Sequence, residues 1–202
     1  MKRYIDLLIY IFVLALLTST AFISMDLLFS KRIEQNQNED FYRAILTHNN
    51  LEFNDDDLFN VFESEIEVQK FYYDNKELNV YFCDATKTIS FVFGIFDQAG
   101  VWGDIIGVMT LDENLEHIVD LSVIQQEEQL GKDVSSRGFL DQFKDLPLNI
   151  GSQRLLIIGP LGDENLPYEV DQLAGATKTS DSFEAILTES YFIHKQLLEE
   201  KN

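Results

Sequence analysis

The feature that most constrains the fold is a series of strand-like segments, separated by turn residues, that begins at Leu78. Their apolar residues recur with the short period of strands, and the breaks between them hold the Gly, Asn and Asp residues typical of turns. Consecutive strands joined by short turns pair in antiparallel fashion. The sequence therefore predicts an antiparallel meander over Val80–Phe82, Ile89–Phe96, Ile105–Leu111 and Ile118–Ile124.

Segments with helical periodicity lie on both sides of this meander. Asp55-Asp56-Asp57 is typical of a helix start. The predicted helices are Phe41–Thr47, one after Asp57, Phe139–Phe143 and Ser182–Glu200, and a further strand is predicted at Leu155–Ile158. This mixture predicts an α+β fold in which an antiparallel sheet is backed by helices.

The N-terminal region is strongly apolar, and no charged residue occurs between Leu7 and Met25. About 20 apolar residues suffice for a helix to span a bilayer, so one N-terminal transmembrane helix is predicted. Lys2 and Arg3 favour an N-terminus on the cytoplasmic side. A cleaved signal peptide is the alternative, because small residues follow the apolar core. In either case we expect the soluble domain to lie outside the cytoplasm, and with a retained anchor the protein is a single-pass protein of the cell membrane.

Charge and composition exclude several classes of function. The chain has 15 basic and 35 acidic residues, a net charge of -20, which argues against nucleic acid as a partner. Cys83 is the single cysteine, so no disulfide framework or thiolate cluster is expected. The three histidines are far apart in the sequence, and we predict no metal site.

The most informative motif lies before the last predicted helix and begins Asp-Gln-Leu-Ala-Gly-Ala-Thr-Lys-Thr-Ser at Asp171. Small residues at Gly175 and Ala176 stand beside three hydroxyls, at Thr177, Thr179 and Ser180. Such a loop suits a phosphate group at a helix N-terminus. An ordinary helix cap by Thr179 or Ser180 explains the same residues, with the acidic Asp181 and Glu184 complementing the helix dipole.

This motif resembles the flavinylation motif of the FMN-binding domain family, which includes flavin-carrying components of the sodium-translocating NADH:quinone oxidoreductase and of the Rnf electron-transport complex. The resemblance implies that Thr177 carries FMN through a phosphoester bond and that Asp171 is the acid that opens the motif. The family usually has Ser or Thr before the Gly, whereas this chain has Ala174.

Two upstream segments extend the resemblance. Gly100, Trp102, Gly103 and Gly107 match the Gly-Leu-Trp-Gly turn of the family. The sequence Gln-Glu-Glu-Gln-Leu-Gly ending at Gly131 is similar to the family's Glu-Thr-Pro-Gly-Leu-Gly, which lies against the flavin, but it is two residues shorter. The cofactor-binding residues implied by the resemblance are Asp171, Gly175, Ala176, Thr177, Lys178, Thr179, Ser180, Glu128, Leu130 and Gly131.

The tetrapeptide Ala-Thr-Lys-Thr also occurs at Ala85–Thr88, where neither a Gly nor the opening Asp precedes it at the matching positions. This copy falls between two predicted strands. We therefore interpret it as a hairpin turn in which Thr86 stays unmodified.

The resemblance implies an electron-transfer component of an oxidoreductase complex rather than a stand-alone enzyme. We expect a transmembrane anchor with a short cytoplasmic N-terminus at residues 1–30, a linker and N-terminal helical part at 31–77, and an FMN-binding domain at 78–202. The expected partners are the membrane, integral-membrane redox subunits and a flavin transferase. An anchored binding or assembly module with an unmodified flavin site, or a pilin-like protein, are the alternatives.

Overall fold

The computed structural model describes residues 10–12, 14–16, 18–20, 22–23, 38–96, 103–128, 131–160 and 166–201. The chain divides into two compact units, Met1–Glu39 and Asp40–Asn202. In the first unit the described residues between 10 and 23 are helical. No helix among the described residues is long and apolar enough to cross a membrane. The predicted anchor falls largely on residues outside those described.

The second unit is built on a six-stranded sheet in the order β1-β2-β3-β4-β5-β6. Every neighbouring pair in this sheet is antiparallel, which confirms the predicted meander. The strands are β1 (Ile66–Tyr73), β2 (Lys76–Cys83), β3 (Thr88–Phe93), β4 (Ile105–Asp112), β5 (His117–Gln126) and β6 (Leu146–Pro147). Strand β1 extends the sheet into the region that was predicted to be linker and helix.

Helices and a small second sheet complete the unit. The helical residues 40–48 precede α2 (Leu58–Glu65). After β5 come η1 (Lys132–Ser135), α3 (Arg137–Leu140) and η2 (Asp141–Phe143), and the chain ends with α4 (Thr177–Lys201). Strands β7 (Ile157–Gly159) and β8 (Glu169–Asp171) pair in parallel.

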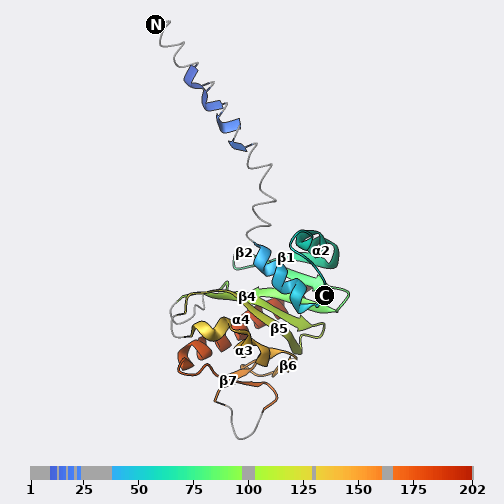
Figure 1. Cartoon of the computed structure of the whole chain (residues 1–202), viewed down its shortest axis with the longest axis vertical. Helices are drawn as coiled ribbons and strands as arrows, with labels where there is room; N and C mark the ends of the chain where they lie inside the picture. The colour runs from blue at the N-terminus through green and yellow to red at the C-terminus, as the bar shows by residue number, and fades with distance from the viewer. Residues whose placement is uncertain are drawn as a thin grey trace. The chain divides into compact units, whose positions relative to one another are not determined.

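Apolar side chains cover both faces of the large sheet. On one face Phe91 and Phe93 of β3 pack with α3, η2, β7 and α4, where Phe183 is fully buried. On the other face Val108 of β4 packs with the 40–48 helix and α2. Figure 1 shows these helices on the two sides of the sheet. The prediction of an α+β unit with a helix-backed sheet is confirmed.

The first Ala-Thr-Lys-Thr copy forms the turn between β2 and β3, as predicted. Lys87 has a positive φ of 55°, which belongs to turns rather than to strands or helices. The hydroxyl of Thr86 donates a hydrogen bond to the side-chain oxygen of Asn49, next to the 40–48 helix. This threonine therefore has a structural partner in the fold.

Candidate functional site

The start of α4 differs from the predicted helix start. The helix begins at Thr177 and not near Ser182, because Ala176 O already accepts the first helical hydrogen bond from Ser180 N at 3.0 Å. Ala176 is therefore the N-cap residue, and its methyl side chain cannot accept a bond from the first helical amides. No side chain among the described residues caps the amides of residues 177–179. The alternative in which Thr179 or Ser180 caps this helix is wrong, because both lie inside it.

The three hydroxyls of the motif have different environments. Thr177 is exposed, whereas Thr179 and Ser180 are only 3% and 0% exposed. Ser180 Oγ accepts from Leu173 N at 3.1 Å and donates to Ala176 O at 3.3 Å. Thr179 Oγ1 donates to Glu128 Oε2 at 2.8 Å. Thr177 is thus the one hydroxyl of the three that solvent and an external reactant can reach.

The loop before α4 leaves space around the exposed hydroxyl. Gly175 has a φ of +73°, and a Cβ atom placed there would meet no atom of the described residues within 4 Å. Ala174 is exposed and Ala176 is buried. A phosphate group can therefore approach the uncapped amides without a clash from this loop.

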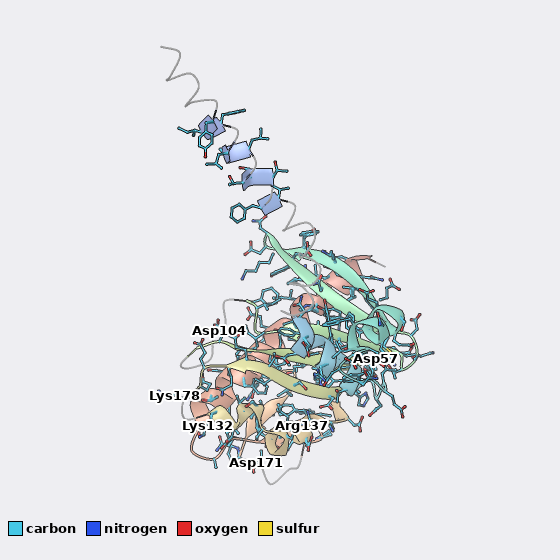
Figure 2. All side chains as sticks on the ribbon, turned by 45° about the horizontal axis from the view of Figure 1, so that its top comes forward. Asp57, Asp104, Lys132, Arg137, Asp171 and Lys178 are labelled. Carbon is cyan, nitrogen blue, oxygen red and sulfur yellow. The ribbon has the colours of Figure 1, made fainter. Side chains whose placement is uncertain are left out.

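The opening acid of the motif lies at the end of β8. The side chain of Gln142 holds the backbone of Asp171: its Oε1 accepts from Asp171 N at 2.9 Å and its Nε2 donates to Asp171 O at 3.4 Å. Asp171 is exposed, and Figure 2 shows its position in the domain. The backbone of this residue, rather than its carboxylate, makes the contacts that position the loop.

The segment after β5 contacts the start of α4. Glu128 is 4% exposed and bonds to Thr179, as described above. Gly131 lies so close to Thr179 that a Cβ atom on the glycine would overlap the threonine side chain. Leu130 lies outside the described residues.

A second family-like segment also makes close contacts. A Cβ atom on Gly103 would overlap the side chain of Glu127. At the irregularity between β4 and β5, a Cβ atom on Gly107 would meet Ser122 O. Both glycines therefore allow close backbone approaches. Gly100 and Trp102 lie outside the described residues. Described residues from three segments that are far apart in the sequence, 103, 127–128 with 131, and 179, thus meet in one region.

This region also contains two lysines in a strongly acidic protein. Lys132 follows Gly131 and Lys178 precedes Thr179, so the contact between Gly131 and Thr179 brings the lysine backbones together. Both side chains are exposed, and neither forms an ion pair with a described residue. Figure 2 shows the two labelled lysines near each other in that view. Together with the helix N-terminus they favour an anion at this place. No local pattern in the sequence marks Lys132, because only the tertiary contact brings it to the motif.

A separate cavity of about 880 Å³ lies between the 40–48 helix, β5 and the segment from η1 to residue 145. None of the predicted site residues lines it. At its edge Arg137 and Lys144 pair with Asp120, at 3.1 and 3.5 Å. Arg137, Lys144 and Asp120 in this cavity are thus all engaged in ion pairs.

Two buried histidines are held neutral in the fold. His48 bonds to Thr110 Oγ1 and Ser122 Oγ, both at 2.7 Å, and burial lowers its pKa from 6.5 to about 4, although the Asp120 carboxylate opposes the shift. Burial likewise lowers the pKa of His194 to about 4, against the effect of its bond to Ser190 O. The His194 ring stacks on Phe91 at a centroid distance of 4.1 Å.

Because the pKa values of these two histidines are lowered in the folded state, we expect the free energy of unfolding to fall as the pH drops from 6.5 towards 4. The unfolded chain binds their protons more readily than the folded chain, so their contribution is complete above pH 6.5 and is lost towards pH 4. His194→Phe should reduce the loss by up to about 3 kcal/mol. Urea unfolding at both ends of this range measures the effect. If the stability of His194→Phe depended on pH in the same way as that of the wild type, the lowered pKa of His194 would be contradicted.

Comparisons with known proteins give one family and two solved structures to which this chain is similar. Residues 100–191 match the FMN-binding domain family. The solved structure of NqrC from Shewanella oneidensis is 14% identical, with a TM-score of 0.64, covering 77% of this chain and 92% of that chain. A solved structure of the corresponding component of the Na⁺-translocating NADH-quinone reductase from Parabacteroides distasonis ATCC 8503 is 20% identical, with a TM-score of 0.64, covering 80% of this chain and 92% of that chain. No match to the sequence is found among curated proteins. At these identities the two structures show a shared fold.

Proposed function

We propose that this chain, whose residues 100–191 match the FMN-binding domain family, carries FMN covalently on Thr177 and transfers electrons. The observation that carries the proposal is the exposure of Thr177 at the start of α4, where the other motif hydroxyls are buried. Bound FMN would supply a ring that accepts and releases electrons. The part of the protein would be to hold this ring and to position it.

The residues at the start of α4 fit an FMN phosphate. The amides of residues 177–179 lack a capping side chain among the described residues, and anions are favoured at such helix ends. Lys178 and Lys132 add positive charge, and Gly175 leaves the approach open. As a diester the phosphate would carry one negative charge, which these groups would stabilise.

Attachment requires an activated FMN phosphate, and FAD provides one in its pyrophosphate. In the proposed step Thr177 Oγ1 forms a bond to the FMN phosphorus while the bond from that phosphorus to the AMP oxygen breaks. The hydroxyl proton passes to solvent, and AMP leaves. A flavin transferase supplies the catalytic groups, so this chain acts as the acceptor and no electrons are exchanged in this step.

We further propose that the chain is part of an Nqr- or Rnf-like redox complex. Its fold is similar to NqrC and to a component of a Na⁺-translocating NADH-quinone reductase. The uncharged run from Leu7 to Met25 supports a single membrane anchor, with the flavin domain on the extracytoplasmic side. Its partners are then integral-membrane redox subunits. The chain works as an electron carrier rather than as a stand-alone enzyme.

Expression of the full chain with a flavin transferase tests this function. We expect a yellow protein whose flavin survives denaturation and precipitation, with a mass increase equal to FMN minus water. A known acceptor of the same transferase is the positive control. An unmodified chain beside a modified control would overturn the proposal. That result would favour an anchored binding or assembly module, in agreement with Ala174 and the shortened segment before Gly131.

A further inference from the structure

A buried hydrogen bond connects the start of α4 to the segment after β5. Glu128 and Thr179 are 4% and 3% exposed, and Thr179 Oγ1 donates to Glu128 Oε2 at 2.8 Å. Removing one partner of a buried hydrogen bond leaves the other partner unsatisfied, and this lowers the stability of the fold. The contact is therefore well suited to fix these two segments against each other.

The same threonine contacts the other end of this short segment. Gly131 has a φ of -101°, which any residue can adopt, so its role is not conformational freedom. Its role is space, because a Cβ atom would overlap both Cγ2 and Oγ1 of Thr179. Glu128 and Gly131 thus both contact the side chain of Thr179. The 3-10 helix η1 begins directly after Gly131, at Lys132.

The geometry of a helix transmits this contact to the acceptor hydroxyl. Successive helical residues are about 100° apart around the axis, so residues 177 and 179 point in nearly opposite directions. When Thr179 faces inwards to Glu128, Thr177 must face outwards to solvent, in agreement with their observed exposure. A rotation or fraying of the first turn would move Thr177 Oγ1 away from this outward position.

We propose that Glu128 and Thr179 form a clamp that sets the rotation of the first turn of α4 and so positions Thr177 for flavin transfer. This inference rests on the proposed attachment of FMN to Thr177. Glu128 is a positioning residue, because it contacts Thr179 and not the reacting oxygen. The role of the carboxylate is to accept a hydrogen bond, which an amide oxygen can also do.

Rates of flavin transfer to purified, unmodified full-length variants test the clamp, with FAD and a flavin transferase as reagents. Thr179→Val and Glu128→Ala should lower the maximal rate roughly 10- to 100-fold, because a small displacement of the reacting atom is enough for such a loss. Glu128→Gln and Thr179→Ser keep an acceptor and a donor, and should retain most of the wild-type rate. In the double variant Glu128→Ala/Thr179→Val the losses should not multiply, because both changes remove the same bond.

Thr188→Val is the matched control on the same helix. Its hydroxyl is also buried, but it forms no hydrogen bond with the described residues, so this change should leave the rate unchanged. Thermal unfolding of each variant shows whether it is folded at the assay temperature. Rapid labelling of folded Thr179→Val and Glu128→Ala would overturn the clamp and leave the flavin function intact. Slow labelling of Glu128→Gln would also overturn it, because charge would then matter more than the bond. A wild-type chain that takes up no flavin would instead overturn the proposed function.

Discussion

Replacing Thr177 with valine should abolish covalent flavin attachment, with labelled protein reduced to the background of the assay. Valine has nearly the same shape as threonine but lacks the oxygen that forms the phosphoester. Thr177 is exposed and no hydrogen bond of its side chain is found among the described residues, so stability should change by only about 0.5 kcal/mol. Intact-mass spectrometry after co-expression with a flavin transferase measures the outcome.

The duplicated tetrapeptide supplies the control for this experiment. Thr86 lies in the same Ala-Thr-Lys-Thr sequence, but in the turn between β2 and β3, where its hydroxyl bonds to Asn49. Thr86→Val should keep full labelling and lose about 1–2 kcal/mol of stability, because the Thr86 hydroxyl forms hydrogen bonds with both Asn49 and Thr88. Labelling of the Thr177→Val variant, or its loss in a folded Thr86→Val variant, would contradict the assignment of the acceptor.

Replacing Phe183 with alanine should produce the largest loss of stability, about 3–5 kcal/mol. Phe183 is fully buried in the second turn of α4. Its ring lies 5.7 Å from Phe93 of β3, 5.9 Å from Phe143 and 6.0 Å from Phe139, measured between ring centroids. The alanine variant would leave a cavity where α4, the sheet and the short helices meet. Urea unfolding followed by circular dichroism measures the change.

Phe192, on the same helix, is the control for this effect. Its side chain is 40% exposed, and Phe192→Ala should cost about 1 kcal/mol or less. Phe183→Leu keeps most of the buried volume, so its loss in the free energy of unfolding should lie between the losses of Phe183→Ala and Phe192→Ala. Equal losses for Phe183→Ala and Phe192→Ala would show that the aromatic cluster does not hold α4 on the sheet.

The sheet was predictable from sequence because its central strands have apolar residues and their turns have clear signals. Strand β1 escaped prediction because it is an edge strand, and most of its residues are at least partly exposed. Ile66 continues the helical spacing of Leu58 and Phe62 in the sequence, but the helix ends at Glu65 and Ile66 begins the strand. Strand β6 has only two residues, one of them Pro147.

The first turn of α4 was missed for a similar physical reason. Its sequence, Thr-Lys-Thr-Ser-Asp, is rich in residues whose short polar side chains favour caps and turns over helix interiors. Contacts with distant residues override this preference, since Thr179 bonds to Glu128 and Ser180 bonds to Leu173 N. Glu128 could be selected only through the family resemblance, and Lys132 only through the structure, because neither has a local signal in the sequence.

The site to which flavin attaches tests the central claim most directly. The full chain is expressed with a flavin transferase and digested, and the peptide that contains residues 171–180 is sequenced by tandem mass spectrometry. We expect this peptide to carry the mass of FMN minus water on Thr177. A flavin on Thr179, on Ser180 or outside the motif would contradict the account, as would an unmodified peptide when a known acceptor is labelled in the same cells.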